Sequence, residues 1–283
     1  MKRTCFYHAG CPDGFGAAWA VRRAWGDDAE YLPRGHEDAF TPAAHEGSVV
    51  VFADISLENG RLRALSEVAA HVIVLDHHVS AREHFESDRG LENELREHGH
   101  IVQFDLEHSG AALAWRHFHA ASPPPDLLAY VEDQDLWRWK LPASEEVNAA
   151  IASYPRRFDV WDELAETPVA DLARQGTPIV RANRSEIERL LRGSHPIVMG
   201  ARRIEAVNSP ILRSSVGHEL AKRASFGAPW GMVYRLHGDR VDVSIYSIGE
   251  LDVSRVAYEH GGGGHRNAAG FSVPLKDWLA RFV

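Results

Sequence analysis

The sequence predicts an α/β protein with two parts: an N-terminal doubly wound, mainly parallel sheet with helices on both faces, and a smaller C-terminal α/β domain across a cleft. Three observations favour this fold. A length of 283 residues suggests about two domains. Short apolar runs in the first hundred residues alternate with helical patterns. The formal charge also divides along the chain, with −13 over residues 1–190 and +4 over residues 191–283.

The N-terminal strands are predicted from apolar runs. Residues 49–53 and 72–75 are continuously apolar rather than alternating, which is typical of parallel strands buried on both faces. Shorter runs at 5–7 and 101–104 predict two more strands. Helical patterns separate or follow these strands at residues 16–21, 60–65 and 108–121. The alternation of strands and helices indicates a doubly wound sheet.

The remainder of the chain predicts a helical connector and a second domain. Residues 126–139 begin as a helix, and residues 159–192 form a polar helical connector. The C-terminal part predicts a strand at 204–208, a helix at 215–224, and a hairpin of strands 231–236 and 241–246. We therefore expect one domain with its helical connector at 1–190 and a second domain at 191–283.

Composition excludes several classes of protein. The net charge of −9 argues against a protein that coats long nucleic acid through bulk positive charge. Only two cysteines, Cys5 and Cys11, are present, which excludes a secreted domain built on disulfides. No apolar run is long enough for a membrane span or a signal peptide. These features predict a cytoplasmic protein.

Polar residues follow three of the predicted strands. His8 and Asp13 follow the first, Asp54 the second, and the triplet at 76–78 the third. Ligands of doubly wound sheets bind at the carboxyl ends of the strands, and carboxylates with imidazoles suit a divalent cation such as Mn²⁺. A carboxylate at Asp54 could bridge two ions, an arrangement that serves phosphoryl displacement. The alternative is a polar strand-to-helix turn in which Asp76 caps the helix.

The order and spacing of these motifs resemble the DHH phosphoesterase superfamily. The motifs are His8-x-x-x-Pro-Asp-Gly, Asp54, Asp76-His77-His78, Asp133, and the sequence GGGGHRNAAG at 261–270. The last motif resembles the branch with the DHH-associated C-terminal domain. That branch contains nanoRNases and other oligoribonucleases, phosphatases of 3′-phosphoadenosine-5′-phosphate, phosphodiesterases of linear and cyclic dinucleotides, and RecJ exonucleases.

The resemblance implies a role for each residue of these motifs. One Mn²⁺ would be held by His8 and Asp54. The other would be held by a set of four residues, with Asp54 shared: Asp13, Asp54, His77 and Asp133. His78 would contact the scissile phosphate, with Asp76 supporting it. Asp135 competes with Asp133 for the fourth motif, and the apolar approach at 130–132 favours Asp133.

The first motif departs from the family pattern at Cys11. The family usually has two aspartates in a D-x-D arrangement, and here Cys11 takes the place of the first. A thiolate ligand at Cys11 would favour Zn²⁺ or Fe²⁺. A water molecule could instead replace the missing ligand, or Cys11 could be a small turn residue that points away.

The glycine quartet is expected to bind substrate. Successive backbone N–H groups of Gly262, Gly263 and Gly264 can cradle a phosphate. The resemblance implies that this loop and His265 hold the terminal phosphate or sugar of the substrate across the cleft. A flexible linker is the alternative.

Four further residues are candidates for substrate contact. Arg255 could pair with a phosphate or be a surface charge. The resemblance places Asn208 near the substrate and Ser109 at a helix start whose N–H groups contact phosphate. Tyr246 could stack on a base, although core packing is the stronger interpretation.

Together these features predict a metal-dependent phosphodiesterase. It would hydrolyse short oligoribonucleotides or linear dinucleotides to nucleoside monophosphates by a two-metal mechanism. Alternatives are a phosphatase of 3′-phosphoadenosine-5′-phosphate, a cyclic-dinucleotide phosphodiesterase, and a non-catalytic nucleotide-binding protein. The expected partner is short RNA or a dinucleotide, with no long nucleic-acid platform and no membrane. The sequence leaves open whether the protein forms a homodimer.

Overall fold

The chain folds into two compact units. The computed structural model describes residues 1–36, 38–199 and 202–282. The units are Met1–Val180 and Arg181–Val283. The division falls ten residues before the predicted boundary at 190, inside the helix α9 that leads from one unit to the other.

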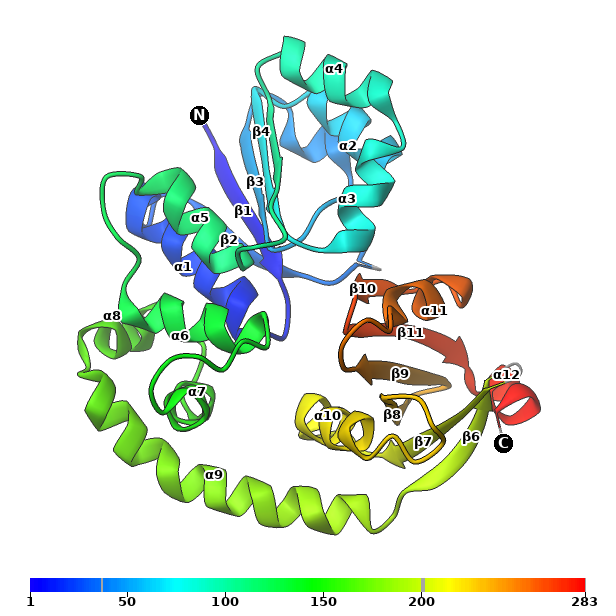
Figure 1. Ribbon diagram of the computed structural model, residues 1–283. Coiled ribbons are helices and arrows are strands. Elements are labelled where there is room, and N and C mark those ends of the chain that lie inside the picture. The colour runs from blue at the N-terminus through cyan, green and yellow to red at the C-terminus, as the bar shows by residue number, and fades with distance from the viewer. Residues whose placement is uncertain (37, 200–201, 283) are drawn as a thin grey trace. The chain divides into compact units, whose positions relative to one another are not determined.

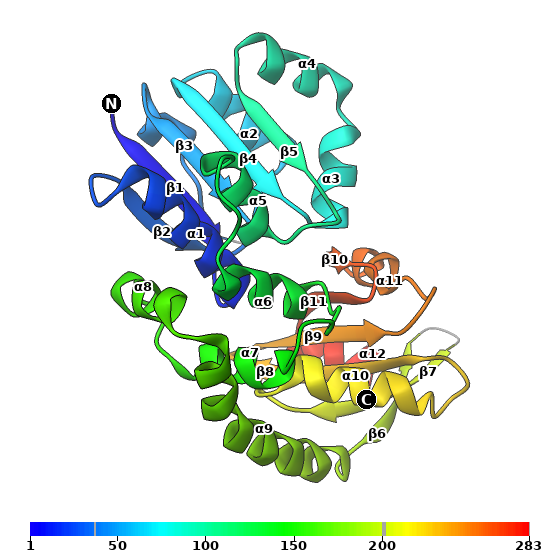
Figure 2. The ribbon, with the colours of Figure 1, turned by 60° about the vertical axis from the view of Figure 1, so that its left-hand side comes forward.

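The first unit is built on a fully parallel five-stranded sheet (Figure 2). Its strand order is β2-β1-β3-β4-β5. The strands are β1 (Arg3–His8), β2 (Glu30–Arg34), β3 (Val49–Ala53), β4 (His71–Asp76) and β5 (Ile101–Phe104). The chain continues from β1 to β2 on one side, and from β3 to β4 on the other. The carboxyl ends of β1 and β3 therefore flank the topological switch point where such sheets bind ligands.

Helices cover both faces of this sheet (Figure 1). One face carries α1 (Pro12–Trp25) and α5 (Gly110–Phe118). The other carries α2 (Asn59–Ser66), α3 (Val79–Glu86) and α4 (Arg89–Glu97), preceded by the 3₁₀ helix η1 (Pro42–His45). The predicted fold class is therefore confirmed.

The continuous apolar runs are buried on both sides, as predicted. In β3, Val51 and Ala53 join the core beneath α1 and α5, whereas Val50 and Phe52 join the core beneath α2 and α4. All four side chains are fully buried. Successive side chains of a strand point to opposite faces, so a strand between two helical layers needs apolar residues at every position.

Strand β2 was not predicted from the sequence. It forms the edge of the sheet, where Tyr31 is partly exposed and Leu32 is 41% exposed. Its Pro33 has no N–H to donate, and proline within a sheet is found at edges. Its sequence, EYLPR, has no continuous apolar run to reveal it.

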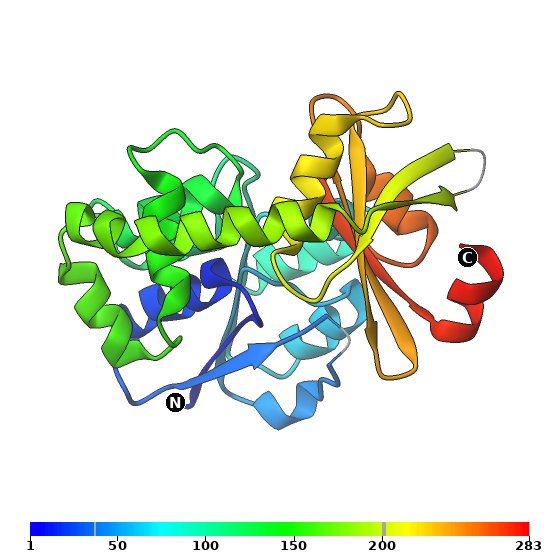
Figure 3. The same cartoon turned by 90° about the horizontal axis from the view of Figure 1, so that it is seen from below.

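The helical second half of the unit contains more breaks than predicted. Its helices are α6 (Asp126–Asp135), α7 (Ser144–Ser153), α8 (Phe158–Glu166) and α9 (Val169–Leu191). The predicted connector at 159–192 is thus two helices, separated at Pro168, because a proline disfavours helical backbone at the residue before it. Figure 3 shows α9 as one long helix.

The second unit contains a mixed six-stranded sheet in the order β10-β11-β9-β8-β7-β6. Its elements are β6 (His195–Met199), β7 (Arg202–Asn208), α10 (Arg213–Arg223), β8 (Trp230–His237), β9 (Arg240–Ser247), α11 (Val253–Glu259), β10 (Gly263–His265), β11 (Ala268–Pro274) and α12 (Leu275–Arg281). The predicted hairpin is confirmed, since β8 and β9 pair antiparallel across a turn at Gly238 and Asp239.

The glycine quartet is part of a hairpin rather than an open loop. Gly263 and Gly264 lie in β10, which pairs antiparallel with β11. A Cβ atom on Gly262 would lie 2.0 Å from the carbonyl oxygen of Gly270, and one on Gly264 would lie 2.7 Å from that of Ala268. Close backbone packing therefore accounts for two of the glycines that were expected to cradle a phosphate.

Across the described residues, every helix is too short or too polar to cross a lipid bilayer.

Within the first unit, a buried histidine links β4 to α2. His100 Nδ1 accepts a hydrogen bond from the Val72 amide at 3.1 Å, and His100 Nε2 donates to the Ser66 carbonyl at 3.1 Å. One nitrogen accepts and the other donates, which only the neutral ring allows. Burial, with His71 and His98 nearby, lowers the pKa of His100, while the Ser66 carbonyl acts in the opposite direction.

We predict that His100 makes the unfolding temperature depend on pH. The pKa of His100 in the folded state lies below the unfolded value of about 6.5. Its contribution to the free energy of unfolding is therefore complete above pH 6.5 and is lost as the pH falls toward the folded pKa. His100→Gln keeps a donor and an acceptor but cannot titrate. Between pH 7.5 and 5.5, the wild type should lose about 2–4 °C more than this variant by calorimetry.

The control is His237→Gln in the other unit, where the replaced imidazole is 75% exposed. This variant should keep the pH dependence of the wild type. The same pH dependence in wild type and His100→Gln would contradict the assignment of a neutral, doubly bonded ring.

Candidate metal centre

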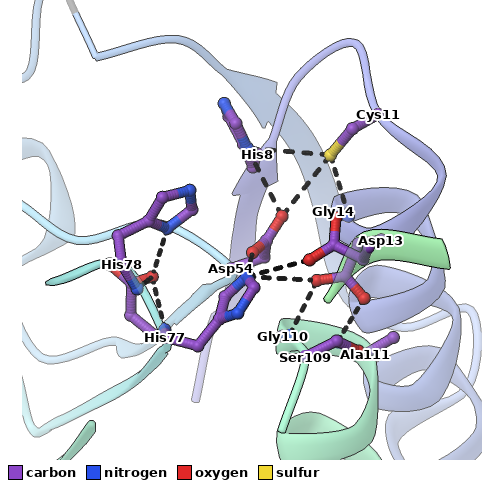
Figure 4. A network of polar contacts seen from close by, with 12 residues as sticks. His8, Cys11, Asp13, Gly14, Asp54, His77, His78, Ser109, Gly110 and Ala111 are labelled. Atoms are coloured by element: carbon purple, nitrogen blue, oxygen red, sulfur yellow. Dashed lines mark hydrogen bonds and ion pairs between the residues drawn. The ribbon is translucent and has the colours of Figure 1, made fainter. Parts of the chain in front are cut away.

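The predicted site residues of the first unit converge at the carboxyl edge of the parallel sheet. His8 ends β1, Asp54 follows β3, and Asp76 ends β4, with His77 and His78 directly after it. Figure 4 shows His8, Asp54 and His77 turned toward one another, with Asp13 of α1 beside them. Parallel strands bring residues distant in sequence to a single edge, so the sheet itself assembles this cluster.

Asp54 lies at the centre of the cluster. Its Oδ2 is 3.4 Å from His8 Nδ1, and its Oδ1 is 3.0 Å from His77 Nε2. The residue is 1% exposed, and its backbone has a positive φ of 62°. Aspartate is one of the few side chains that tolerate this left-handed conformation, which turns the carboxylate between the two imidazoles.

The electrostatics of the cluster are those of crowded buried charges. Although burial opposes ionisation, His77 and His8 hold the pKa of Asp54 well below its usual value. Burial likewise opposes protonation of His77, yet Asp54, Asp135 and Asp13 raise the pKa of His77. A proton on His77 thus supplies positive charge where the carboxylates converge.

Asp13 is fixed by the start of α5. Its Oδ2 accepts the Gly110 amide at 2.7 Å and its Oδ1 accepts the Ala111 amide at 3.1 Å. Burial, followed by the charges of Asp54 and Asp135, raises the pKa of Asp13 well above its usual value. These contacts hold the carboxylate rigidly among like charges.

The expected role of Ser109 needs correction. The Ser109 amide donates to Glu132 Oε2 at 3.2 Å, its hydroxyl caps α5 by accepting from the Ala112 amide, and the next two amides of α5 bind Asp13. This helix start therefore binds the protein's own carboxylates rather than presenting its N–H groups to a phosphate.

The structure places Asp135, not Asp133, beside the cluster. Asp135 Oδ2 lies 3.5 Å from His77 Nε2, is buried, and accepts no hydrogen bond among the described residues. Asp133 accepts the amides of Lys140 and Leu141 at 2.9 and 3.2 Å. Two residues apart on a helix, the carboxylates point to nearly opposite sides, so Asp133 stabilises the turn after α6 while Asp135 faces the cluster.

Cys11 points into the cluster rather than away from it. Its Sγ is 3.4 Å from Asp54 Oδ2 and 3.6 Å from His8 Nδ1, and it accepts the Gly14 amide at 3.2 Å as the N-cap of α1 (Figure 4). Both cysteines are free thiols. This orientation argues against the interpretation of Cys11 as a small turn residue that points away.

Asp76 orients His78. Its Oδ1 lies 2.7 Å from His78 Nδ1 and accepts the amides of His77 and His78 at 2.7 and 3.2 Å. Burial opposes protonation of His78, but Asp76 raises its pKa. Because Asp76 engages Nδ1, Nε2 is the nitrogen of His78 that a substrate could reach.

His36 is a neighbour of the cluster that sequence reasoning missed. Its ring centroid lies 5.3 Å from that of His8 and 6.1 Å from that of His78. His36 follows β2, the strand that the sequence did not reveal, so no positional signal was available.

The predicted substrate residues of the second unit do not form one cluster in it. Gly263, Gly264 and His265 lie in β10 and Gly262 precedes it, whereas Asn208 ends β7, with three strands between them. Arg255 is an 85% exposed helix residue, 3.6 Å from Asp252, as in its surface-charge interpretation.

Tyr246 packs within the second unit. A Cβ atom on Gly217 would lie 1.9 Å from the Tyr246 ring, so the ring rests directly on α10. Its hydroxyl is 3.3 Å from Ser214 Oγ, and the adjacent Arg213 donates to Ser244 Oγ at 3.2 Å. Packing, rather than stacking on a base, explains the position of this tyrosine.

The residues fit divalent cations. Within the first unit, two groups have donor atoms close enough to share an ion: His8, Asp54 and His78, and Asp13, His77 and Asp135. Carboxylates of Asp13, Asp54 and Asp135 lie 3.6, 3.0 and 3.5 Å from one nitrogen, His77 Nε2. Three buried carboxylates that converge on one imidazole are costly unless a cation balances their charge.

The amino-acid sequence has one viral relative among curated proteins, whereas no model of a known protein family matches the chain. The relative is a protein of Acanthamoeba polyphaga mimivirus, called uncharacterized protein R106, which is 27% identical over 94% of this chain. The chain spans 66% of the length of that relative, slightly less than two thirds.

Solved structures similar to this chain include three bacterial proteins. The pGpG-specific phosphodiesterase PggH from Vibrio cholerae is 10% identical, with 99% of this chain and 96% of that chain covered and a TM-score of 0.47. An exopolyphosphatase-related protein from Bacteroides fragilis is 14% identical, with 95% and 86% covered and a TM-score of 0.50. RecJ in complex with Mn²⁺ from Thermus thermophilus is 20% identical, with 99% and 50% covered and a TM-score of 0.49.

The similarity to the Bacteroides protein is a similarity of fold. This chain therefore has the two-part α/β fold that the resemblance to DHH phosphoesterases implied.

We predict that Gly110→Ala displaces Asp54. A Cβ atom at Gly110 would lie 2.3 Å from the Asp54 Cβ and 2.7 Å from its Oδ1. Affinity for Mn²⁺, measured by calorimetric titration, should fall by roughly tenfold or more, as for other changes that misplace metal ligands. Gly60→Ala in α2 is the matched control, because a Cβ atom there meets nothing within 4 Å. Equal affinity in both variants would contradict this packing argument.

We also predict that Asp133 and Asp135 separate stability from metal binding. Asp135→Asn should weaken Mn²⁺ binding without lowering the unfolding temperature. Asp133→Asn should lose about 1–3 kcal/mol of stability, because an amide side chain can accept only one of the two backbone N–H groups, while Mn²⁺ affinity stays near that of the wild type. Calorimetry and metal titration on both variants test this, and the opposite pattern would restore Asp133 as the ligand.

Proposed function

We propose that this chain is a metal-dependent phosphodiesterase of the DHH superfamily that cleaves short oligoribonucleotides or linear dinucleotides to nucleoside monophosphates. One observation carries the proposal: the two oxygens of Asp54 face separate groups of ligands, one with His8 and the other with His77, Asp13 and Asp135. This is the arrangement expected of a carboxylate shared by two ions.

The chain's own residues would bind the ions and orient the substrate. His8 and Asp54 would hold one ion. The other would be held by Asp13, Asp54, His77 and Asp135, so that Asp135 takes the role that the resemblance gave to Asp133. Bound there, divalent ions would polarise the phosphoryl group and lower the pKa of water. Mn²⁺ suits the carboxylate and imidazole groups of the second set.

His78 would stabilise negative charge on the phosphoryl oxygens. Asp76 engages Nδ1 of His78 and raises its pKa, so that Nε2 can donate a hydrogen bond to an anionic oxygen. Asp76 is therefore a positioning residue. Its Oδ1 also accepts two backbone amides, which fix the orientation of the whole triplet.

Charge supports a small anionic substrate. Residues 191–283 carry twelve Lys and Arg against eight Asp and Glu, whereas residues 1–190 carry nineteen against thirty-two. We assign phosphate binding to the basic C-terminal part, with His265 and the hairpin of β10 and β11 as its candidate contacts. A long polyanion would be repelled by the acidic part, apart from the metal centre.

An activity panel tests the proposal. Protein loaded with Mn²⁺ should cleave pGpG and diribonucleotides to monophosphates faster than it acts on cyclic dinucleotides, 3′-phosphoadenosine-5′-phosphate, polyphosphate or long single strands. His77→Ala should abolish this turnover because it removes a ligand of the metal centre. Asp159→Asn, an exposed change on α8, is the matched control and should retain full activity.

Each result has a definite meaning. Preference for polyphosphate would overturn the substrate class, and preference for the bisphosphorylated nucleoside would favour a phosphatase. If the protein binds dinucleotides without cleaving them, and His77→Ala binds them equally well, the result would favour a non-catalytic nucleotide-binding protein.

A further inference from the structure

Three donor atoms from separate elements form a small triangle at the switch point of the sheet. Cys11 Sγ lies 3.4 Å from Asp54 Oδ2 and 3.6 Å from His8 Nδ1, and the latter two atoms are 3.4 Å apart. His8 comes from β1, Cys11 from the N-cap of α1, and Asp54 from the end of β3. Thiol, imidazole and carboxylate are three of the usual zinc-binding groups.

The size of this triangle matches one face of a tetrahedral metal site. Zinc bonds of about 2.0–2.3 Å at tetrahedral angles separate neighbouring ligand atoms by about 3.4–3.6 Å. An octahedral ion with bonds of about 2.0–2.1 Å separates neighbouring ligands by only about 2.9 Å. The observed separations therefore fit a tetrahedral ion that bonds to all three atoms.

The orientation of the sulfur is fixed by the fold. The Gly14 amide donates to Sγ at 3.2 Å, so the first turn of α1 holds the sulfur toward Asp54. Burial, followed by the charges of Asp54, Asp13 and Asp135, raises the pKa of the Cys11 thiol well above its usual value, so loss of its proton requires a bound cation. Asp54 Oδ1 is buried and lies 3.0 Å from His77 Nε2, yet it accepts no hydrogen bond among the described residues. The carboxylate thus keeps acceptor capacity for an ion.

We propose that Cys11 is a thiolate ligand which, with His8 and Asp54, makes one of the two metal positions a tetrahedral site selective for a borderline-soft cation such as Zn²⁺ or Fe²⁺. The S–H bond breaks as the sulfur–metal bond forms, and the proton passes to the solvent. Three protein ligands leave the fourth position open, as in catalytic zinc sites. The inference rests on the proposed metal centre and assigns different ions to its two halves.

Co²⁺ is the probe, because its absorption reports both sulfur ligation and tetrahedral geometry. Titration of Co²⁺ into the full chain should produce a near-ultraviolet sulfur-to-cobalt charge-transfer band and intense visible bands. Cys11→Ser should remove the charge-transfer band, yet it should fold, because serine is a good N-cap and can accept the same Gly14 amide. Cys5→Ala should keep the band, because Cys5 is buried in the core and its sulfur contacts the Phe6 carbonyl.

A second variant measures selectivity. Cys11→Asp places a carboxylate where the thiol was, so the ratio of Zn²⁺ to Mn²⁺ affinity should fall by roughly tenfold or more. Absence of the sulfur band in the wild type, or its persistence in Cys11→Ser, would overturn the proposal, as would an unchanged affinity ratio in Cys11→Asp.

Failure of this inference is distinguishable from failure of the proposed function. A sulfur band in a protein that cleaves no nucleotide would retain Cys11 as a ligand and remove the phosphodiesterase. Turnover with Mn²⁺ and no sulfur band would retain the phosphodiesterase and remove the thiolate.

Discussion

The site depends on one buried carboxylate held in an uncommon backbone conformation. Asp54 follows the central strand β3 with a φ of 62°, and this turn places one carboxylate oxygen near His8 and the other near His77. A buried carboxylate is stable only where positive charge or hydrogen bonds surround it. The surrounding imidazoles, and the cations that we propose, answer that requirement, and the remaining site residues are arranged around this group.

The supporting structure leaves this carboxylate little freedom. The start of α5 approaches so closely that only glycine fits at position 110, and the amides of Gly110 and Ala111 bind Asp13. Asp76 performs a similar task for His78 on the neighbouring strand. Packed backbone and buried hydrogen bonds therefore fix the distances between charged groups, which lets like charges remain close enough to share a cation.

Elements whose burial requires a run of apolar residues were predicted from the sequence. The partly exposed strand β2, which has no such run, was missed. Residues 49–53 form a strand with the predicted bounds, because a strand between two helical layers must be apolar throughout. Residues 101–104 also form a strand with the predicted bounds, although they lie at the other edge of the sheet and Gln103 is exposed. The edge strand β2 carries no such pattern, and His36 was missed with it. The choice between Asp133 and Asp135 depends on which side of α6 faces the cluster, and Gly110 depends on a neighbour far away in the chain, so neither could be read from local sequence.

The central claim is that Asp54 serves both halves of the metal centre. Asparagine tolerates the same left-handed backbone, so Asp54→Asn removes the charge while preserving the local conformation. Equilibrium dialysis should find two tightly bound divalent ions per wild-type chain and loss of both from this variant, with the fold intact by circular dichroism. Retention of both ions by Asp54→Asn, at the wild-type affinity, would contradict the account.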